Sequence, residues 1–218
     1  LGKAFLAIED ERFYQHNGID FKSIIRAGYQ FFKTGGEEAQ GASTITQQLL
    51  KNTVFTDWTS EGNNKIKKIK RKIQEQYLAL EITKYYSKDE ILLRYMNAIN
   101  LGQNTLGVES ASLRYFGKHC SELTISECAV IASITQNPSK YNPIRHPEEN
   151  VKRREKCLNK MLELGFISQT QYDEAMADTN AVYERIGLYD IDYQEANATT
   201  GSYFSDAVYA VSYTHLRA

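Results

Sequence analysis

EDERFYQHNGID, residues 9–20, and QGASTITQQ, residues 40–48, are the two stretches around which the chain is organised. The first begins with three consecutive carboxylates and continues with two aromatic rings, a His and a turn at Gly18. The second consists of small, hydroxyl and amide residues and carries no charge. We expect Glu9 to end a short apolar helix over residues 4–9, beside a glycine-containing turn. A carboxylate placed there can serve general acid–base chemistry, and adjacent Asp10 can orient it or bias its charge.

The composition limits the class of protein. The chain has 218 residues, 42% of them hydrophobic, which suits one large domain with a sizeable core. A net charge of -1 argues against a generally basic nucleic-acid binder. The three cysteines are too few for a disulfide framework, and we expect free, buried thiols. No apolar run approaches the roughly 18 residues that span a bilayer.

Outward from the two stretches, helical signals dominate. Asp20 suits the N-cap of a helix that ends at Gly35-Gly36, and Ser43 or Thr44 suits the cap of the next. Apolar residues at helical spacing predict a long helix over residues 65–84, with six cations between Lys65 and Lys72. Three capping boxes begin at Ser87, Thr124 and Ser168, and Pro147 suits a first helical turn. Because period-2 alternation is almost absent, the predicted fold class is mainly α.

Three parts of the chain do not follow this pattern. Residues 52–64 contain Phe55 and Trp58 among small polar residues, which indicates a flexible segment with exposed apolar side chains. After Asn180 the helical pattern fades, and residues 203–211 suit one strand. Residues 212–218 fit nothing before them and are expected to be a non-native tail.

The chain starts at Leu1 rather than Met, so we expect an upstream segment in a longer protein.

Each candidate site residue also has an ordinary structural explanation. The carboxylates beside Glu9 suit a solvated helix end, His16 suits a structural role, and Ser43 and Thr44 suit caps. Arg71, Lys72 and Glu75 share one helix face, which suits either a surface ion-pair ladder or a carboxylate held by cations beside an anionic phosphate. Exposed aromatic residues next to a cationic helix also suit an anionic membrane surface.

Several motifs in order resemble those of the peptidoglycan glycosyltransferases, the polymerising domain of class A penicillin-binding proteins and of monofunctional transglycosylases. The resemblance covers roughly residues 1–175. The motifs are Glu9-Asp10-x-x-Phe13-x-x-His16-x-Gly18, the segment 41–48 followed by Lys51-Asn52, Arg71-Lys72-x-x-Glu75, residues 88–97, the region 101–117, and the Asn137-Pro138 and Arg153-Arg154 segments.

The resemblance implies a lysozyme-like, two-lobed helical domain over residues 1–180, with a smaller, membrane-contacting lobe. Residues 181–218 would be a linker towards a transpeptidase domain beyond this chain. The implied reaction is inverting polymerisation of lipid II into glycan strands. Glu9 would be the general base, and Glu75 would assist with Lys51, Arg71 and Lys72 at the donor pyrophosphate. Contacts to substrate would come from Asp10, Phe13, His16, Ser43, Thr44, Gln47, Gln48 and Asn52.

A divalent cation, Mg or Mn, is implied by the resemblance alone, because no ligand cluster in the sequence indicates a metal site. The implied location is the extracytoplasmic face of the bacterial cell membrane, with the anchor absent from this chain. The implied partners are lipid II, the growing glycan strand and the membrane surface, and no nucleic acid; nothing indicates an oligomeric state. Two alternatives stay open: a lysozyme-like enzyme that cleaves peptidoglycan, and a non-catalytic helical module that binds wall or membrane. Glu9 and Glu75 are expected to line one cleft, farther apart than the ~5 Å of retaining glycosidases.

Overall fold

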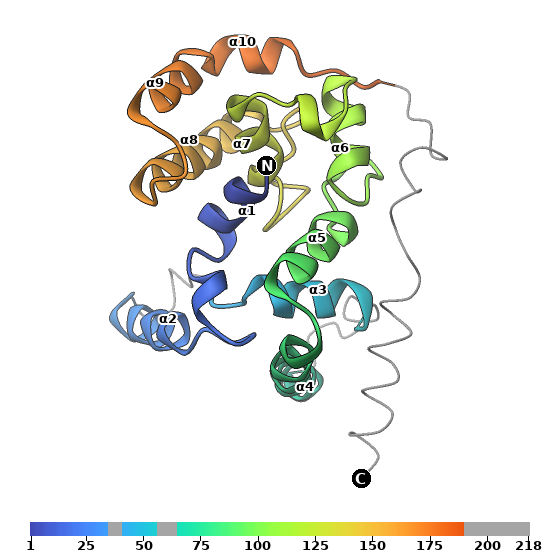
Figure 1. Cartoon of the computed structure of the whole chain (residues 1–218), viewed down its shortest axis with the longest axis vertical. Coiled ribbons are helices and arrows are strands. Elements are labelled where there is room, and N and C mark those ends of the chain that lie inside the picture. The colour runs from blue at the N-terminus through green and yellow to red at the C-terminus, as the bar shows by residue number, and fades with distance from the viewer. Residues whose placement is uncertain (35–40, 56–64, 190–218) are drawn as a thin grey trace. The chain divides into compact units, whose positions relative to one another are not determined.

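A computed structural model describes residues 1–34, 41–55 and 65–189 (Figure 1). The chain divides into two compact units, each of which is described by itself. Among the described residues, the first unit comprises 1–11 and 96–189, and the second comprises 12–34, 41–55 and 65–95. Within the described ranges the secondary structure is helical, with one isolated antiparallel bridge between Asn100 and Leu106. The predicted mainly α fold is therefore confirmed over these residues.

The first unit is built around helix α7. Its helices are α1 (Gly2–Glu9), α6 (Val108–Phe116), α7 (Ile125–Ser133), α8 (Pro147–Glu163), α9 (Gln169–Ala177) and α10 (Thr179–Glu184), with the short 3-10 turn η3 (Cys120–Glu122). Helix α7 packs against α8, and α1 packs against both (Figure 1). Because every residue from Ser126 to Ser133 is buried, α7 forms the centre of this unit's core. The fully buried side chain of Phe5 fixes the path of α1, and therefore the position of Glu9 at its end.

The second unit contains η1 (Phe13–Gln15), α2 (Phe21–Thr34), α3 (Ile45–Thr53), α4 (Lys65–Tyr85) and most of α5 (Lys88–Ala98). Helix α3 packs on α4, and Leu49, Leu50, Leu78 and Ile82 are buried there. Helix α2 buries none of its side chains. The amino-terminal half of α4 is also exposed: Ile66, Ile69 and Ile73 are predicted correctly as helical, yet they are not part of a core.

The predicted helix starts are confirmed. Thr44, Thr124 and Ser168 each form a complete capping box, and the Glu90 carboxylate accepts from the Ser87 N–H at 2.8 Å. The Ser23 N–H donates to the Asp20 carboxylate at 3.1 Å, as an N-cap requires. These local signals work because a side chain and the backbone three residues on satisfy each other's hydrogen bonds.

Three points of the sequence reading of the helices need correction. The helical pattern does not fade at Asn180, because Thr179–Glu184 forms α10. Val182 is completely buried in α10, which packs on α7 and α9, so tertiary packing stabilises a helix that its own sequence pattern does not mark. Helix α6 was not predicted. The alternative of a surface ion-pair ladder at Glu75 is wrong as well, since that side chain has no exposed area.

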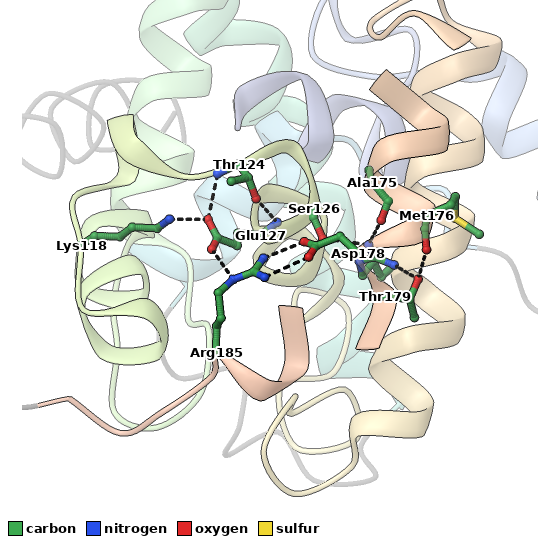
Figure 2. A network of polar contacts seen from close by, with 10 residues as sticks. Lys118, Thr124, Ser126, Glu127, Ala175, Met176, Asp178, Thr179 and Arg185 are labelled. Carbon is green, nitrogen blue, oxygen red and sulfur yellow. Dashed lines mark hydrogen bonds and ion pairs between the residues drawn. The ribbon is translucent and has the colours of Figure 1, made fainter. Parts of the chain in front are cut away.

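A polar network ties α10 to the rest of the first unit (Figure 2). The buried Glu127 carboxylate accepts from the Lys118 ammonium at 2.7 Å, from the Thr124 N–H at 2.8 Å and from Arg185 at 3.3 Å. Arg185 also forms a double ion pair with Asp178. Burial alone raises the pKa of Glu127, but the Lys118, Thr124 and Arg185 donors outweigh it and hold that pKa below its usual range.

The other expectations about the carboxyl-terminal part lie outside the described residues. These are the strand at 203–211 and the tail at 212–218. The expected exposure of Trp58 also concerns a residue outside the described ranges. The boundary at residue 180 also stays a prediction. None of the helices in the described ranges is long and apolar enough to cross a membrane.

Candidate active site

The second unit brings the predicted motifs together, beginning at Gly18. The Thr44 hydroxyl donates to the Gly18 carbonyl at 2.6 Å, which joins the first motif to the second. Gly18 has φ +89°, and a Cβ there would lie 2.1 Å from the Ala79 carbonyl oxygen. Only glycine fits this position, because an added side chain would clash with the backbone of α4. The turn after Phe13 is therefore packed directly against the helix that carries Glu75.

Glu75 anchors a group of cations in this unit. Its fully buried carboxylate pairs with Arg71, four residues earlier, and with the Lys72 ammonium at 2.9 Å. Lys72 also donates to the Ser43 hydroxyl at 2.8 Å, so the second and third motifs meet at one ammonium. The Lys72 side chain is 40% exposed. Two cations thus pair with one carboxylate, and Lys72 is the more exposed of the two, since 16% of the Arg71 side chain is exposed.

The fourth motif joins the same group through α5. The Tyr95 hydroxyl donates to the Gln48 amide oxygen at 3.2 Å. The Lys88 ammonium lies 4.4 Å from the centroid of the buried Phe13 ring, and the His16 ring packs edge-on against the same Phe at 6.2 Å. Phe13 is therefore a packing centre for the first motif, with a cation on its face.

Two polar pairs fix the backbone of the first motif. The Tyr14 hydroxyl donates to Asp89 at 2.6 Å, and this carboxylate raises the pKa of Tyr14 to about 12. Arg12 donates to Asp20 at 2.8 Å. Burial raises the pKa of Asp20, but hydrogen bonds from Ser23 and Arg12 outweigh it and lower that pKa overall.

Glu9 belongs to the first unit and has partners that sequence reasoning missed. Its carboxylate accepts from the Thr135 hydroxyl and from the Arg153 guanidinium at 2.6 Å. Only 9% of the Glu9 side chain is exposed, so it is not the solvated helix end that composition allows. In the sequence Arg153 belongs only to a family motif, and nothing in the spacing of Thr135 or Arg153 points to Glu9.

The remaining predicted residues fall into two groups. Thr44 and Gln47 are buried and hold each other in the capping box at the start of α3. Lys51 and Asn52 lie half-buried at the other end of the same helix, and Asp10 is buried beside Glu9. Contacts between these side chains and substrate stay predictions. Glu9 and Asp10 lie in the first unit, and all other predicted site residues lie in the second unit. A cleft shared by both groups of residues therefore also stays a prediction.

Among the described residues, no three His, Cys, Asp or Glu side chains lie close enough together to coordinate a metal ion without other ligands. Mg²⁺ is commonly held by one or two carboxylates together with substrate phosphates. The divalent cation therefore stays a prediction. All three cysteines are free, as expected, and Cys128 and Cys157 are buried, whereas Cys120 is only half-buried, so the expectation of three buried thiols is wrong there. Burial raises the pKa of Cys157 to about 12.

Comparison with known proteins identifies the family of the chain. Residues 1–162 match the family described as Transglycosylase. The chain belongs to this transglycosylase family, that of the peptidoglycan glycosyltransferases. Penicillin-binding protein 1A of Clostridium perfringens (strain 13 / Type A) is 45% identical over 192 residues, covering 84% of this chain and 27% of the relative. Penicillin-binding protein 1F of Bacillus subtilis (strain 168) is 42% identical over 177 residues, covering 81% and 24%.

The family resemblance seen in the sequence is thus confirmed, and with it the enzyme class. A crystal structure of penicillin-binding protein 1A from Haemophilus influenzae is 30% identical with a TM-score of 0.43, covering 58% of this chain and 17% of that one. The chain spans about a quarter of the length of the curated relatives. Activities that belong to the remaining three quarters of these relatives are therefore not attributed to this chain.

Proposed function

We propose that this transglycosylase domain polymerises lipid II into glycan strands by direct, inverting displacement. The observation that carries this proposal is the buried Glu75 with its two cations. Pyrophosphate leaves as an anion, so the donor side of a lipid-linked glycosyl transfer needs positive charge. A hydrolase of finished peptidoglycan instead needs an acid that protonates a sugar leaving group.

Glu75 serves this reaction by holding the cations rather than by touching substrate. A side chain with no exposed area cannot contact a ligand in this state, whereas Lys72 is 40% exposed. Arg71 and Lys72 are fixed by the same carboxylate, and Ser43 fixes the Lys72 ammonium from a second segment of the chain. Cations held in advance stabilise developing charge without the cost of reorganising them. The family resemblance extends this donor side to Lys51 and Asn52.

Glu9 acts as the general base in this proposal. Its carboxylate takes the proton from the acceptor 4-hydroxyl as that oxygen attacks the anomeric carbon of the growing chain. The bond to the pyrophosphate-lipid breaks as the new glycosidic bond forms, so the configuration inverts. The proposal predicts that Glu9 and the cations held by Glu75 line one cleft, with the two carboxylates separated by more than ~5 Å because no covalent sugar–enzyme intermediate is needed. Coordinates of the protein with a bound substrate analogue will check this spacing.

The place of reaction follows from the substrate. A lipid-linked precursor holds the enzyme at the membrane surface, and we place the domain at the extracytoplasmic face of the bacterial membrane. Helix α4 supports this placement, because Ile66, Ile69 and Ile73 are exposed among lysines in its first turns. Apolar side chains flanked by cations suit an anionic lipid surface.

Two substrates given to the same preparation test the proposal. With lipid II and a divalent cation, the protein should lengthen a glycan and release polyprenyl pyrophosphate. With finished peptidoglycan, it should release no new reducing ends. Solubilisation of peptidoglycan by a protein that ignores lipid II would establish the lytic alternative. Binding of wall or membrane with neither reaction would establish the non-catalytic alternative.

A further inference from the structure

The Glu9 carboxylate is held through one oxygen by two side chains from distant parts of the first unit. Oε1 accepts from the Thr135 hydroxyl, just after α7, and from Arg153 Nη2 on α8 at 2.6 Å. Arg153 Nη2 also lies 3.3 Å from the Thr135 oxygen, so the three groups form a closed triangle. We propose that Arg153 and Thr135 are positioning residues for Glu9. This inference rests on the proposed role of Glu9 as the base.

Arg153 is itself held in place, which a positioning residue requires. Its Nη1 donates to the Gln136 amide oxygen at 2.9 Å, and its guanidinium lies 5.0 Å from the centroid of the Tyr141 ring. Only 11% of its side chain is exposed. A planar guanidinium fixed at one face and at two nitrogens has little freedom to rotate. It therefore defines the direction in which Glu9 can present its carboxylate.

Arg153 brings a positive charge directly against the Glu9 carboxylate, with Nη2 at 2.6 Å from Oε1. Thr135 is neutral, and the nearby Cys157 thiol on α8 stays neutral because burial raises its pKa to about 12. Asp10, the next residue in the chain, is a buried carboxylate of the same sign as Glu9. Arg153 therefore joins a directional hydrogen bond to an attraction between opposite charges, as a positioning residue for a carboxylate should.

Three variants separate direction from charge in the full 218-residue chain. Thr135→Val keeps the shape but removes the hydroxyl donor, and Arg153→Ala removes both the fork and the cation. Arg153→Lys restores the cation without the fork. Since a misplaced catalytic group costs up to about 10²-fold in rate, we expect Arg153→Ala to lower kcat by about 10- to 100-fold and Thr135→Val by a smaller factor. The KM for lipid II should change by less than about twofold, because neither residue contacts substrate in the proposal.

The split between kcat and KM distinguishes positioning from a merely structural role. In Arg153→Ala kcat per folded molecule should fall while KM stays near its parental value, because the Glu9 carboxylate is still present but is no longer held in one direction. Arg153→Lys keeps a cation without the planar fork, so its kcat should also stay low. Lys156→Ala, an exposed position one turn further along α8, is the matched control and should leave both quantities unchanged. Melting temperatures of all variants show how much activity is lost through unfolding.

Each outcome bears on one of the two proposals. Parental kcat in Arg153→Ala, with Glu9→Gln inactive, would overturn the positioning role and leave the proposed base intact. Activity lost only in proportion to folded protein would also overturn it. Full activity in Glu9→Gln would instead overturn the proposed function on which the inference rests.

Discussion

Glu75 and Glu9 are both nearly buried carboxylates paired with cations, but their partners come from very different distances along the chain. Arg71 and Lys72 lie four and three residues before Glu75 on the same helix. The partners of Glu9 lie 126 and 144 residues away from it. A helix places residues three and four apart on one face, so the first group follows from spacing, whereas the second exists only after α1 packs on α7 and α8. The two carboxylates also differ in role, since Glu75 holds cations and Glu9 is held by one.

The largest expected effect is the loss of the base. Glu9→Gln keeps the size of the side chain but cannot accept the proton, so polymerisation should fall by about 10²-fold or more. Glu11→Gln, two residues further along and half-buried, is the control and should stay within about twofold of the parent. Release of pyrophosphate-lipid from lipid II measures both variants. Parental turnover in Glu9→Gln would remove Glu9 from the mechanism.

Next in size is the loss of one donor-side cation. Arg71→Ala leaves Glu75 with Lys72 alone and removes one of the two charges proposed to meet the leaving group. We expect turnover to fall by about 10-fold or more, while α4 stays folded because alanine is a strong helix former. Lys70→Ala, exposed on the same helix, is the matched control for assays in detergent. Equal activity in the two variants would show that Arg71 serves the fold and not the reaction.

The contrast between the two carboxylates also marks how far the sequence could predict the site. Caps at Asp20, Thr44, Thr124 and Ser168 were predicted because they use hydrogen bonds within a few residues, and the cation group at Glu75 follows the same logic. Thr135 and Arg153 could not be found this way, since no periodicity connects them to Glu9. Helix α10 was missed for a related reason: buried Val182 stabilises it through contacts with other helices. The exposed apolar stripe of α4 shows the converse limit, because spacing predicts a helix but not what covers it.

Glu127 sharpens the comparison, since it is a buried carboxylate paired with cations that has a structural role. Glu127→Gln should lower the free energy of unfolding by about 1–2 kcal/mol at neutral pH, the scale of a lost charged hydrogen bond. The loss stays modest because Lys118 and Arg185 are 30% and 42% exposed and can be solvated. Polymerisation per folded molecule should be unchanged. Glu184→Gln, exposed on α10, is the control.

The same carboxylate predicts a dependence of stability on acid. The folded-state pKa of Glu127 lies below its usual range, so its contribution is present above the unfolded pKa, about 4.3 for Glu. As pH falls below that value, the contribution is lost progressively until the folded-state pKa is passed. Denaturant unfolding between neutral pH and about pH 3 should therefore show a shallower acid decline in Glu127→Gln than in the parent. Identical slopes would mean that the acid dependence of stability comes mainly from other carboxylates whose pKa is lowered in the folded state, such as Asp20 and Asp178.

The smallest expected effect compares the two ends of α4, the cationic amino-terminal turns that begin at Lys65 and the last turn at Lys84. If the exposed lysines near Ile66 and Ile69 meet an anionic bilayer, each contributes about 1 kcal/mol near the surface, and salt should weaken binding. The double variant Lys67→Gln, Lys70→Gln should bind vesicles containing anionic lipid less tightly than the parent, with no change on neutral vesicles. Lys84→Gln, 61% exposed at the other end of the helix, is the matched control and should bind as the parent does.

Phe55→Ser tests the predicted apolar insertion separately, and its effect should persist in high salt because burial of apolar area is not screened. Binding that ignores salt, or that falls equally in Lys84→Gln, would show that the amino-terminal turns of α4 do not face the membrane.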